Sequence, residues 1–209
     1  VCKLREKYPQ DRLNLVENDV LKMDWQELLE KTGGEKFYVV ANLPYNITGP
    51  FLFKILEQAD FINDAVLMLQ REVAKRLIAT PGGRDYGRIS VLLGVRANIE
   101  QIIEVNRRAF IPTPRVDSSV LKLHFLNSPR FDIEDCNLFD SVVKFAFGQR
   151  RKMLRNSLRC LITNGKEESL ANWEERSGID FNKRPEQLYI EEFVRLGNVL
   201  YSLRENRNE

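Results

Sequence analysis

The chain has 209 residues, of which 43% are hydrophobic and 30% charged, a composition typical of a globular protein with one ordinary and one smaller domain. The formal net charge of +2 excludes a strongly basic protein, so affinity for nucleic acid must come from a local patch. Cys2, Cys136 and Cys160 form no Cys-x-x-Cys pair, which predicts reduced thiols and a cytoplasmic protein. No apolar run approaches the ~18 residues of a membrane span. The single His124 lies in an alternating run, so we expect a strand residue there and no metal site.

Short apolar runs alternate with stretches of helical spacing in the first third of the chain. Strands are predicted at residues 13–16, 37–41 and 65–69, and helices at residues 25–31, 49–58 and 71–79. Strand and helix thus alternate three times with short links. This alternation is typical of βαβ units and predicts an α/β fold with a parallel sheet.

The middle of the chain departs from this alternation. Residues 88–95 are predicted to form a helix, and residues 100–105 and 116–125 two strands with no helix between them, hence an antiparallel pair. The loop between these strands, residues 110–114, is stiffened by two prolines and begins with Phe110, which is either a core anchor or a site residue. From residue 131 onward the pattern is helical. We therefore expect an α/β domain over residues 1–128 and a helical domain over residues 129–209.

Asn42-Leu43-Pro44-Tyr45 directly follows the apolar run at 37–41 and reads as the turn that ends a buried strand. Pro44 fixes φ, so the turn is stiff, and it presents the Asn42 amide, the Leu43 carbonyl and the Tyr45 ring at the strand's carboxyl end. Ligands bind at that edge of open α/β sheets. Two hydrogen-bond acceptors beside an aromatic ring suit the exocyclic amine of a flat heterocycle. The simpler alternative is that these four residues form a turn whose tyrosine belongs to the core.

Residues 137–164 combine an apolar and a basic helical face. The apolar face carries Val143, Phe147, Leu154, Leu158 and Leu161, and the neighbouring basic face carries Lys144, Arg151, Lys152, Arg155 and Arg159. No acidic residue occurs between Asp140 and Glu167, so these cations lack an acidic partner in the sequence. A phosphate backbone is the compensating anion that we expect.

Five stretches of the chain, in this order, resemble the ribosomal RNA adenine dimethyltransferases of the KsgA/Dim type. They are Glu17-Asn18-Asp19-Val20, Asn42-Leu43-Pro44-Tyr45-Asn46-Ile47, Gln70-Arg71-Glu72-Val73-Ala74, the run from Phe110 to Ser118 (FIPTPRVDS), and the run from Phe147 to Asn156 (FGQRRKMLRN). The resemblance implies a class I, Rossmann-like methyltransferase sheet that uses S-adenosylmethionine, followed by a small all-helical domain. It also implies dimethylation of two adjacent adenines near the 3′ end of small-subunit ribosomal RNA, in a pre-30S-type particle, by a monomer.

The same resemblance assigns roles to individual residues. Asn42 and the Leu43 carbonyl accept the hydrogens of the adenine amine, Pro44 holds the turn, and Tyr45 and Phe110 stack on the extruded base. Asp19, Val20 and Asn42 contact the methyl donor, with Asp19 at the edge of its adenine. The basic run binds RNA, through Arg150, Arg151, Lys152, Arg155 and Arg159.

One feature of the family is not found in the sequence. The glycine-rich donor loop should precede Asp19, and the chain contains no Gly-x-Gly. The chain also opens without Met, inside a predicted helix, which predicts a fragment whose donor loop lies before Val1 and which is itself inactive.

Two alternatives share this pattern. An Erm-type methyltransferase would perform the same chemistry on large-subunit RNA, although Leu43 and the run 149–156 favour the KsgA side. A noncatalytic ribosome-assembly or transcription factor on the same fold would bind RNA only, and intact Asn42, Tyr45 and Phe110 argue against it.

Overall fold

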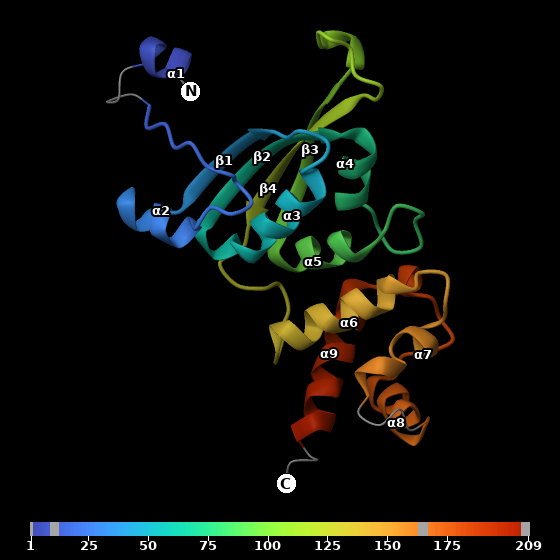
Figure 1. The fold of residues 1–209 in the computed structure, drawn as a ribbon. Helices are drawn as coiled ribbons and strands as arrows, with labels where there is room; N and C mark the ends of the chain where they lie inside the picture. The colour runs from blue at the N-terminus through green and yellow to red at the C-terminus, as the bar shows by residue number, and fades with distance from the viewer. Residues whose placement is uncertain (1, 9–12, 163–166, 206–209) are drawn as a thin grey trace.

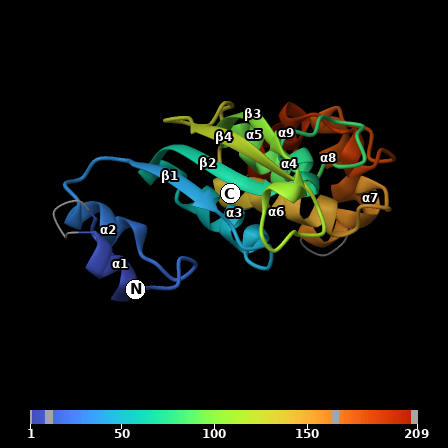
Figure 2. The same ribbon diagram turned by 90° about the horizontal axis from the view of Figure 1, so that it is seen from above.

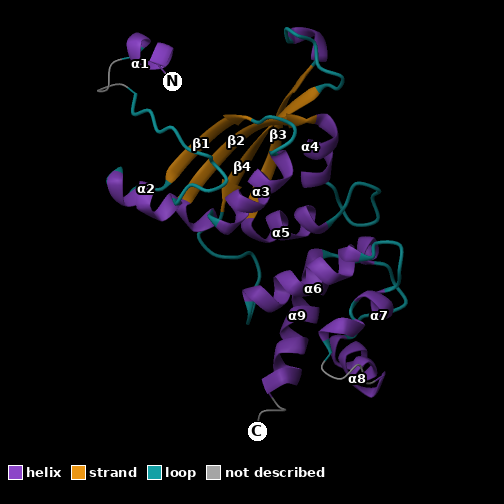
Figure 3. Ribbon diagram, in the orientation of Figure 1, coloured by secondary structure: helices purple, strands orange, loops and turns teal. Residues whose placement is uncertain are grey.

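The computed structural model describes residues 2–8, 13–162 and 167–205. Its sheet has the strand order β1-β2-β4-β3 (Figure 1; Figure 3). The strands are β1 (Phe37–Asn42), β2 (Ile62–Gln70), β3 (Ala97–Val105) and β4 (Ser118–Phe125). β1 and β2 are parallel, whereas β4 runs antiparallel to both β2 and β3. The predicted strands at 37–41 and 65–69 and the antiparallel pair are thereby confirmed.

The helices of the sheet region follow the predicted order. They are α1 (Cys2–Lys7), α2 (Trp25–Lys31), α3 (Thr48–Glu57), α4 (Arg71–Leu77) and α5 (Arg88–Arg96). Short 3-10 turns lie at η1 (Ala59–Phe61) and η2 (Arg107–Ala109). α3 connects the parallel strands β1 and β2, so the βαβ unit predicted around the Asn42 turn is present. The Asp24 carboxylate caps α2 by accepting from the Glu27 backbone N–H at 3.0 Å.

One face of the sheet carries the apolar core. Alternate residues of β2 and β4, including Leu67, Leu69 and Leu121, are fully buried and belong to one cluster with Ile55 of α3 and Leu93 of α5. Alternate side chains of a strand point to opposite faces, so these helices cover a single face. Tyr38 and Val40 of β1 face the other way, with 72% and 82% of their surface exposed.

The strand predicted at residues 13–16 is wrong. These residues form no helix or strand, and Val16 is 56% exposed. A strand requires a hydrogen-bonded neighbour, and within the described residues β1 pairs only with β2. The local sequence favours an extended backbone, but within the described residues no neighbouring strand forms hydrogen bonds with these residues.

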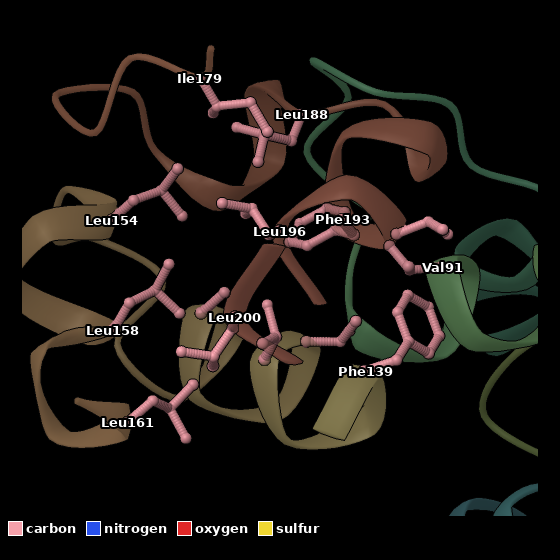
Figure 4. Close-up of a cluster of buried hydrophobic side chains, with 14 of the residues drawn as sticks. Val91, Phe139, Leu154, Leu158, Leu161, Ile179, Leu188, Phe193, Leu196 and Leu200 are labelled. Carbon is pink, nitrogen blue, oxygen red and sulfur yellow. The ribbon is translucent and has the colours of Figure 1, made fainter. Parts of the chain in front are cut away.

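The second half of the chain forms helices around a separate cluster. They are α6 (Cys136–Gly148), α7 (Leu154–Ser157), α8 (Glu167–Ser177) and α9 (Ile190–Glu205), with 3-10 turns η3 (Arg159–Leu161) and η4 (Pro185–Gln187). Figure 4 shows Leu154, Leu158 and Leu161 directed toward Leu196 and Leu200 of α9, as the predicted apolar face requires. Trp173 is fully buried and its Nε1–H donates to the Leu196 carbonyl at 3.0 Å. Seen from above, α7 to α9 lie at the end of the molecule opposite to α1 and α2 (Figure 2).

Helix α5 belongs to both clusters. Leu93 faces the sheet, whereas Val91, Leu92 and Val95 pack in the helical cluster. The contact with α9 is close at Gly94, where an added Cβ would stand 2.5 Å from the Ile190 Cδ1. The domain boundary between residues 128 and 129 stays a prediction, with the chain passing from β4 into α6 at this point (Figure 1).

Candidate active site and nucleic-acid interface

The turn after β1 is fixed by hydrogen bonds on both sides. The Leu43 N–H donates to the Met68 carbonyl of β2 at 3.4 Å, and the Leu43 side chain is only 6% exposed. The Pro44 carbonyl accepts from the Ile47 N–H at 3.2 Å and from the Thr48 hydroxyl at 3.1 Å. The backbone therefore leaves the strand, turns at Pro44 and enters α3 in one defined conformation.

This turn carries two hydrogen-bond acceptors that no other described group engages. The Asn42 residue is exposed, and within the described residues no hydrogen bond engages its side-chain amide or the Leu43 carbonyl. Because Asn42 is the last residue of β1, both groups lie at the carboxyl end of the parallel pair. Such free acceptors suit a ligand that carries an amine with two hydrogens.

A cavity of about 300 Å³ joins this turn to the β3–β4 loop, residues 106–117. Its lining is formed by Asn42, Leu43, Pro44, Tyr45, Met68, Phe110, Ile111, Pro112, Pro114 and Ser118. The structure thus brings together the five residues assigned to catalysis, although Phe110 is 65 or more positions from the others. Tyr45 is 44% exposed, Phe110 is half-buried, and neither belongs to an apolar cluster. Their surroundings are those of rings lining a cavity and not of core anchors.

The β3–β4 loop is anchored by Asp117. Its Oδ1 accepts from the Arg107 N–H at 3.0 Å, and its Oδ2 lies 3.2 Å from the Arg71 guanidinium. The Arg107 guanidinium also donates to the Arg115 carbonyl at 3.2 Å. A second cavity of about 220 Å³ at this place is lined by Arg71, Arg107 and Arg115. Sequence reasoning assigned no role to these arginines, although the position of Arg107 and Arg115 on either side of Phe110 was a usable signal.

The structure does not bring Asp19 and Val20 to the cavity of Asn42. Asp19 is exposed and its Oδ1 accepts from the Leu21 N–H at 3.0 Å, which leaves Oδ2 without a partner within the described residues. Val20 is half-buried and packs against the sheet cluster. The donor-binding roles of these residues stay predictions.

The helical spacing predicted over residues 137–164 does not correspond to one helix. α6 ends at Gly148, and the chain turns before α7 begins at Leu154. The Leu154 and Arg155 N–H groups donate to the Lys183 and Phe181 carbonyls at 2.9 and 3.0 Å, in place of the preceding turn of a helix. These tertiary hydrogen bonds outweigh the local helical pattern.

The basic residues of this run are not equivalent. Arg155 does have an acidic partner, since its guanidinium lies 3.5 Å from the Glu174 carboxylate, so the expectation of wholly unpaired cations is wrong. Arg150 is half-buried and donates to the backbone carbonyls of Gly83, at 3.4 Å, and Arg84. Arg151, Lys152 and Arg159 are exposed and form no ion pair within the described residues. These three, together with Lys144, which is also exposed and forms no ion pair within the described residues, are therefore the side chains most available to an external anion.

A larger basic cavity lies between the sheet helices and the end of α6. Its volume is about 800 Å³, and its charged lining consists of Lys75, Arg76, Arg84, Arg88 and Arg150 with Glu72 and Asp85. The excess of cations makes this cavity a second candidate surface for phosphate. Sequence reasoning missed it because these residues come from α4, α5 and two loops, which only the fold brings together.

Three further observations concern the described part of the chain. Cys136 and Cys160 are free thiols, as predicted for them, while the Cys2 side chain lies outside the described residues. His124 lies in β4 with Nδ1 2.6 Å from Asp64 Oδ1, and no group of three His, Cys, Asp or Glu side chains there could hold a metal ion. Among the described residues, no helix combines the length and the apolar character of a membrane span.

The sequence as a whole matches the family model described as ribosomal RNA adenine dimethylase over residues 1–201. The chain belongs to this family. The "Ribosomal RNA small subunit methyltransferase A" of Pseudomonas aeruginosa is 43% identical over 198 residues, covering 95% of this chain and 70% of that protein. The protein of the same name from Clostridium botulinum is 40% identical over 193 residues, covering 92% and 69%.

Solved structures agree with the fold of this adenine dimethylase. A dimethyladenosine transferase from Plasmodium falciparum is 25% identical with a TM-score of 0.71, covering 99% of this chain and 77% of that one. The 23S rRNA methyltransferase ErmE, at 24% identity and a TM-score of 0.63, covers 96% and 77% and shows the fold alone. The class I methyltransferase fold with a C-terminal helical region is thereby confirmed.

Membership of a methyltransferase family implies S-adenosylmethionine as the methyl donor. The residues fit this group in chemistry. The donor's adenine carries an amine, and the Asp19 Oδ2, assigned to the edge of that adenine, is an acceptor without a partner within the described residues. The Asn42 turn also lies at the strand end where class I enzymes bind their ligands.

Proposed function

We propose that the protein dimethylates the exocyclic N6 amines of two adjacent adenines near the 3′ end of small-subunit ribosomal RNA, during ribosome biogenesis in the cytoplasm. The observation that carries the proposal is the cavity in which two free acceptors, Asn42 and the Leu43 carbonyl, lie beside Tyr45 and Phe110. The names of the relatives from P. aeruginosa and C. botulinum support the small subunit as the source of the RNA.

The chemical problem is the weak nucleophilicity of the adenine amine, whose lone pair is delocalised into the ring. S-adenosylmethionine supplies an electrophilic methyl group. The Asn42 Oδ1 and the Leu43 carbonyl accept one amine hydrogen each, which favours a pyramidal nitrogen with a localised lone pair. No strong base is required, because the amine loses its proton easily once it is methylated, and no metal is part of the proposed step.

The target base must leave the RNA stack to reach this cavity. Extrusion costs a few kcal/mol, and stacking on an aromatic side chain returns ~1–3 kcal/mol per base. Tyr45 and Phe110 supply the rings from two different loops, so the extruded adenine is held between them. Since these two terms nearly cancel, net affinity must come from contacts with the RNA backbone.

The cations available for those contacts are Arg151, Lys152 and Arg159, and in the large basic cavity Lys75, Arg76 and Arg84. Arg88 and Arg150 of that cavity are already engaged, by the Asp140 carboxylate and by backbone carbonyls. We assign Arg155 to the same surface and Arg150 to its support, because Arg150 is engaged with backbone carbonyls. The proposed substrate is the RNA within a pre-30S-type particle, bound by a monomer.

Transfer of labelled methyl groups to purified small-subunit particles by the full-length protein tests the proposal. We expect N6,N6-dimethyladenosine at two adjacent positions, detected by mass spectrometry of nuclease digests. Modification of large-subunit RNA instead would establish the Erm-type activity. RNA binding without any methyl transfer would establish a noncatalytic assembly factor.

A further inference from the structure

Ile111 is an unusual residue of the β3–β4 loop. All of its surface is exposed, the largest fraction of any large apolar side chain in the described part of the chain. A single exposed apolar side chain needs no explanation by itself. Ile111, however, also lines the cavity of Asn42, Tyr45 and Phe110, so it lies at the rim of the site into which the base is proposed to move.

Phe110 and Ile111 are adjacent residues of the cavity lining that differ in exposure. Phe110 is extended, with φ −114° and ψ 147°. Phe110 is half-buried at the cavity, whereas Ile111 is fully exposed at its rim. Adjacent Cα atoms are about 3.8 Å apart. When the Phe110 ring stacks on the extruded base, the Ile111 side chain therefore lies next to the position that the base has left.

The β3–β4 loop is stiff enough to hold Ile111 in this position. Pro112, directly after Ile111, and Pro114 fix φ at two positions of the loop. The Thr113 hydroxyl donates to the Phe110 carbonyl at 3.3 Å, and Asp117 holds the Arg107 N–H at 3.0 Å. The adjacent cavity is lined by Arg71, Arg107 and Arg115 together with Glu72 and Asp117, so cations exceed carboxylates beside the cavity of Phe110. The hairpin that carries the loop projects beyond the rest of the sheet (Figure 1).

We infer that Ile111 is a wedge that enters the base stack of the RNA in the space vacated by the target adenine. The inference rests on the proposed function, since it needs an extruded base. Apolar side chains, isoleucine among them, separate base steps in other nucleic-acid complexes. Ile111 would act as a positioning residue: it touches the neighbouring bases, not the reacting atoms, and prevents the target adenine from restacking.

The test compares Ile111→Ala with Ile102→Ala, which removes an isoleucine that is 53% exposed on β3, away from the cavity. Ile111→Leu is the conservative variant. The RNA is a stem-loop with two adjacent adenines and 2-aminopurine at the nucleotide beside them, which fluoresces when it is unstacked. We expect the natural protein, Ile102→Ala and Ile111→Leu to raise the fluorescence at saturation, and Ile111→Ala to lose at least half of the rise.

Single-turnover methylation provides the second measurement. We expect Ile111→Ala to slow methylation of the stem-loop about tenfold, because extrusion is no longer stabilised. On an RNA with an abasic site next to the target, the same variant should stay within about twofold of the natural protein, since no stack has to be opened there. Equal slowing on both RNAs, or an unchanged fluorescence rise in Ile111→Ala, would overturn the inference. If the natural protein methylated neither these RNAs nor small-subunit particles, the proposed function would fail, while the fluorescence would still decide the role of Ile111.

Discussion

The Arg155 guanidinium lies 3.5 Å from the Glu174 carboxylate, and the same carboxylate accepts from the Phe181 N–H at 2.8 Å. Arg155 therefore joins α7 to α8 as well as facing solvent. Its neighbours Arg151 and Lys152 have no such partner within the described residues. Cations that are adjacent in the sequence consequently have different roles.

The first prediction concerns the salt dependence of RNA binding. Arg151→Ala and Lys152→Ala should each lower the log–log slope of affinity against salt by about one, because each removes one phosphate contact. Fluorescence anisotropy over a range of salt concentrations measures the slope. Arg150→Ala is the matched control: the slope should not change, although the melting temperature should fall because its hydrogen bonds to Gly83 and Arg84 are lost. The assignment is contradicted if Arg150→Ala changes the slope and Arg151→Ala does not.

The second prediction distinguishes a role of Tyr45 in the site from a role in the core. Tyr45→Ala should slow methylation about ten- to hundredfold, from the loss of ~1–3 kcal/mol of stacking. Its melting temperature should hardly change, since the ring is 44% exposed. Leu43→Ala keeps the backbone carbonyl but should cost about 2–5 kcal/mol of stability, because the side chain is buried. Thermal melts and single-turnover kinetics give both quantities. If Tyr45→Ala lost stability and activity in parallel, the Tyr45 ring would have a structural role instead of a role in the site.

The third prediction concerns Asn42, whose amide is assigned to both the amine and the donor. Asn42→Ala should lower the methylation rate and the affinity for S-adenosylmethionine together, about tenfold or more in rate. Phe110→Ala should lower the rate alone. Calorimetry of donor binding by the full-length protein distinguishes the two variants. Unchanged donor affinity in Asn42→Ala would restrict this residue to the adenine.

The fourth prediction concerns Tyr86, which is 1% exposed and packs against Phe147 with ring centroids 6.0 Å apart. Burial, together with the Glu191 and Glu192 carboxylates, raises the pKa of the Tyr86 phenol. The hydroxyl has no hydrogen-bond partner within the described residues. Tyr86→Phe should therefore leave stability unchanged or raise it by up to ~1 kcal/mol, as chemical denaturation can measure. A clear loss of stability would reveal a hydrogen bond to this hydroxyl.

The fifth prediction concerns the stability of the protein at low pH. The hydrogen bond with His124, and secondarily the Lys122 ammonium, lowers the pKa of the Asp64 carboxyl, against the opposing effect of burial. Because the pKa of Asp64 is lower in the folded than in the unfolded state, its ionised carboxylate stabilises the protein at pH values above the unfolded-state pKa, about 3.9. This stabilisation is lost as the pH falls through the folded-state pKa. Asp64→Asn should lower the stability by about 1 kcal/mol at pH 7, and the difference should disappear in strong acid. The control Asp60→Asn, whose carboxylate is 68% exposed, should have little effect at either pH.

Much of the site was predictable because its signals are local. The run at 37–41 and Pro44 fix where β1 ends, so the placement of Asn42 and Tyr45 at a strand's carboxyl end followed from the sequence. The meeting of Phe110 with this turn did not follow from spacing. It depends on β4 pairing with β2 as well as with β3, and only the β3–β4 pair was predicted from the local pattern.

The errors share one cause, which is tertiary hydrogen bonding. Residues 13–16 have the composition of a strand but no paired neighbour within the described residues. Residues 149–153 have helical spacing, yet the N–H groups of Leu154 and Arg155 bond to residues 183 and 181. The Arg155–Glu174 pair was also invisible, because its members are 19 positions apart and a turn brings them together.

Helix α5 has a consequence for how the molecule unfolds. Because Leu93 completes the sheet core while Val91, Leu92 and Val95 complete the helical core, neither core can open without exposing one side of α5. The close contact of Gly94 with Ile190 joins them further. The two halves should therefore melt in one cooperative transition, and the amides of α5 should exchange with solvent only when the whole chain unfolds.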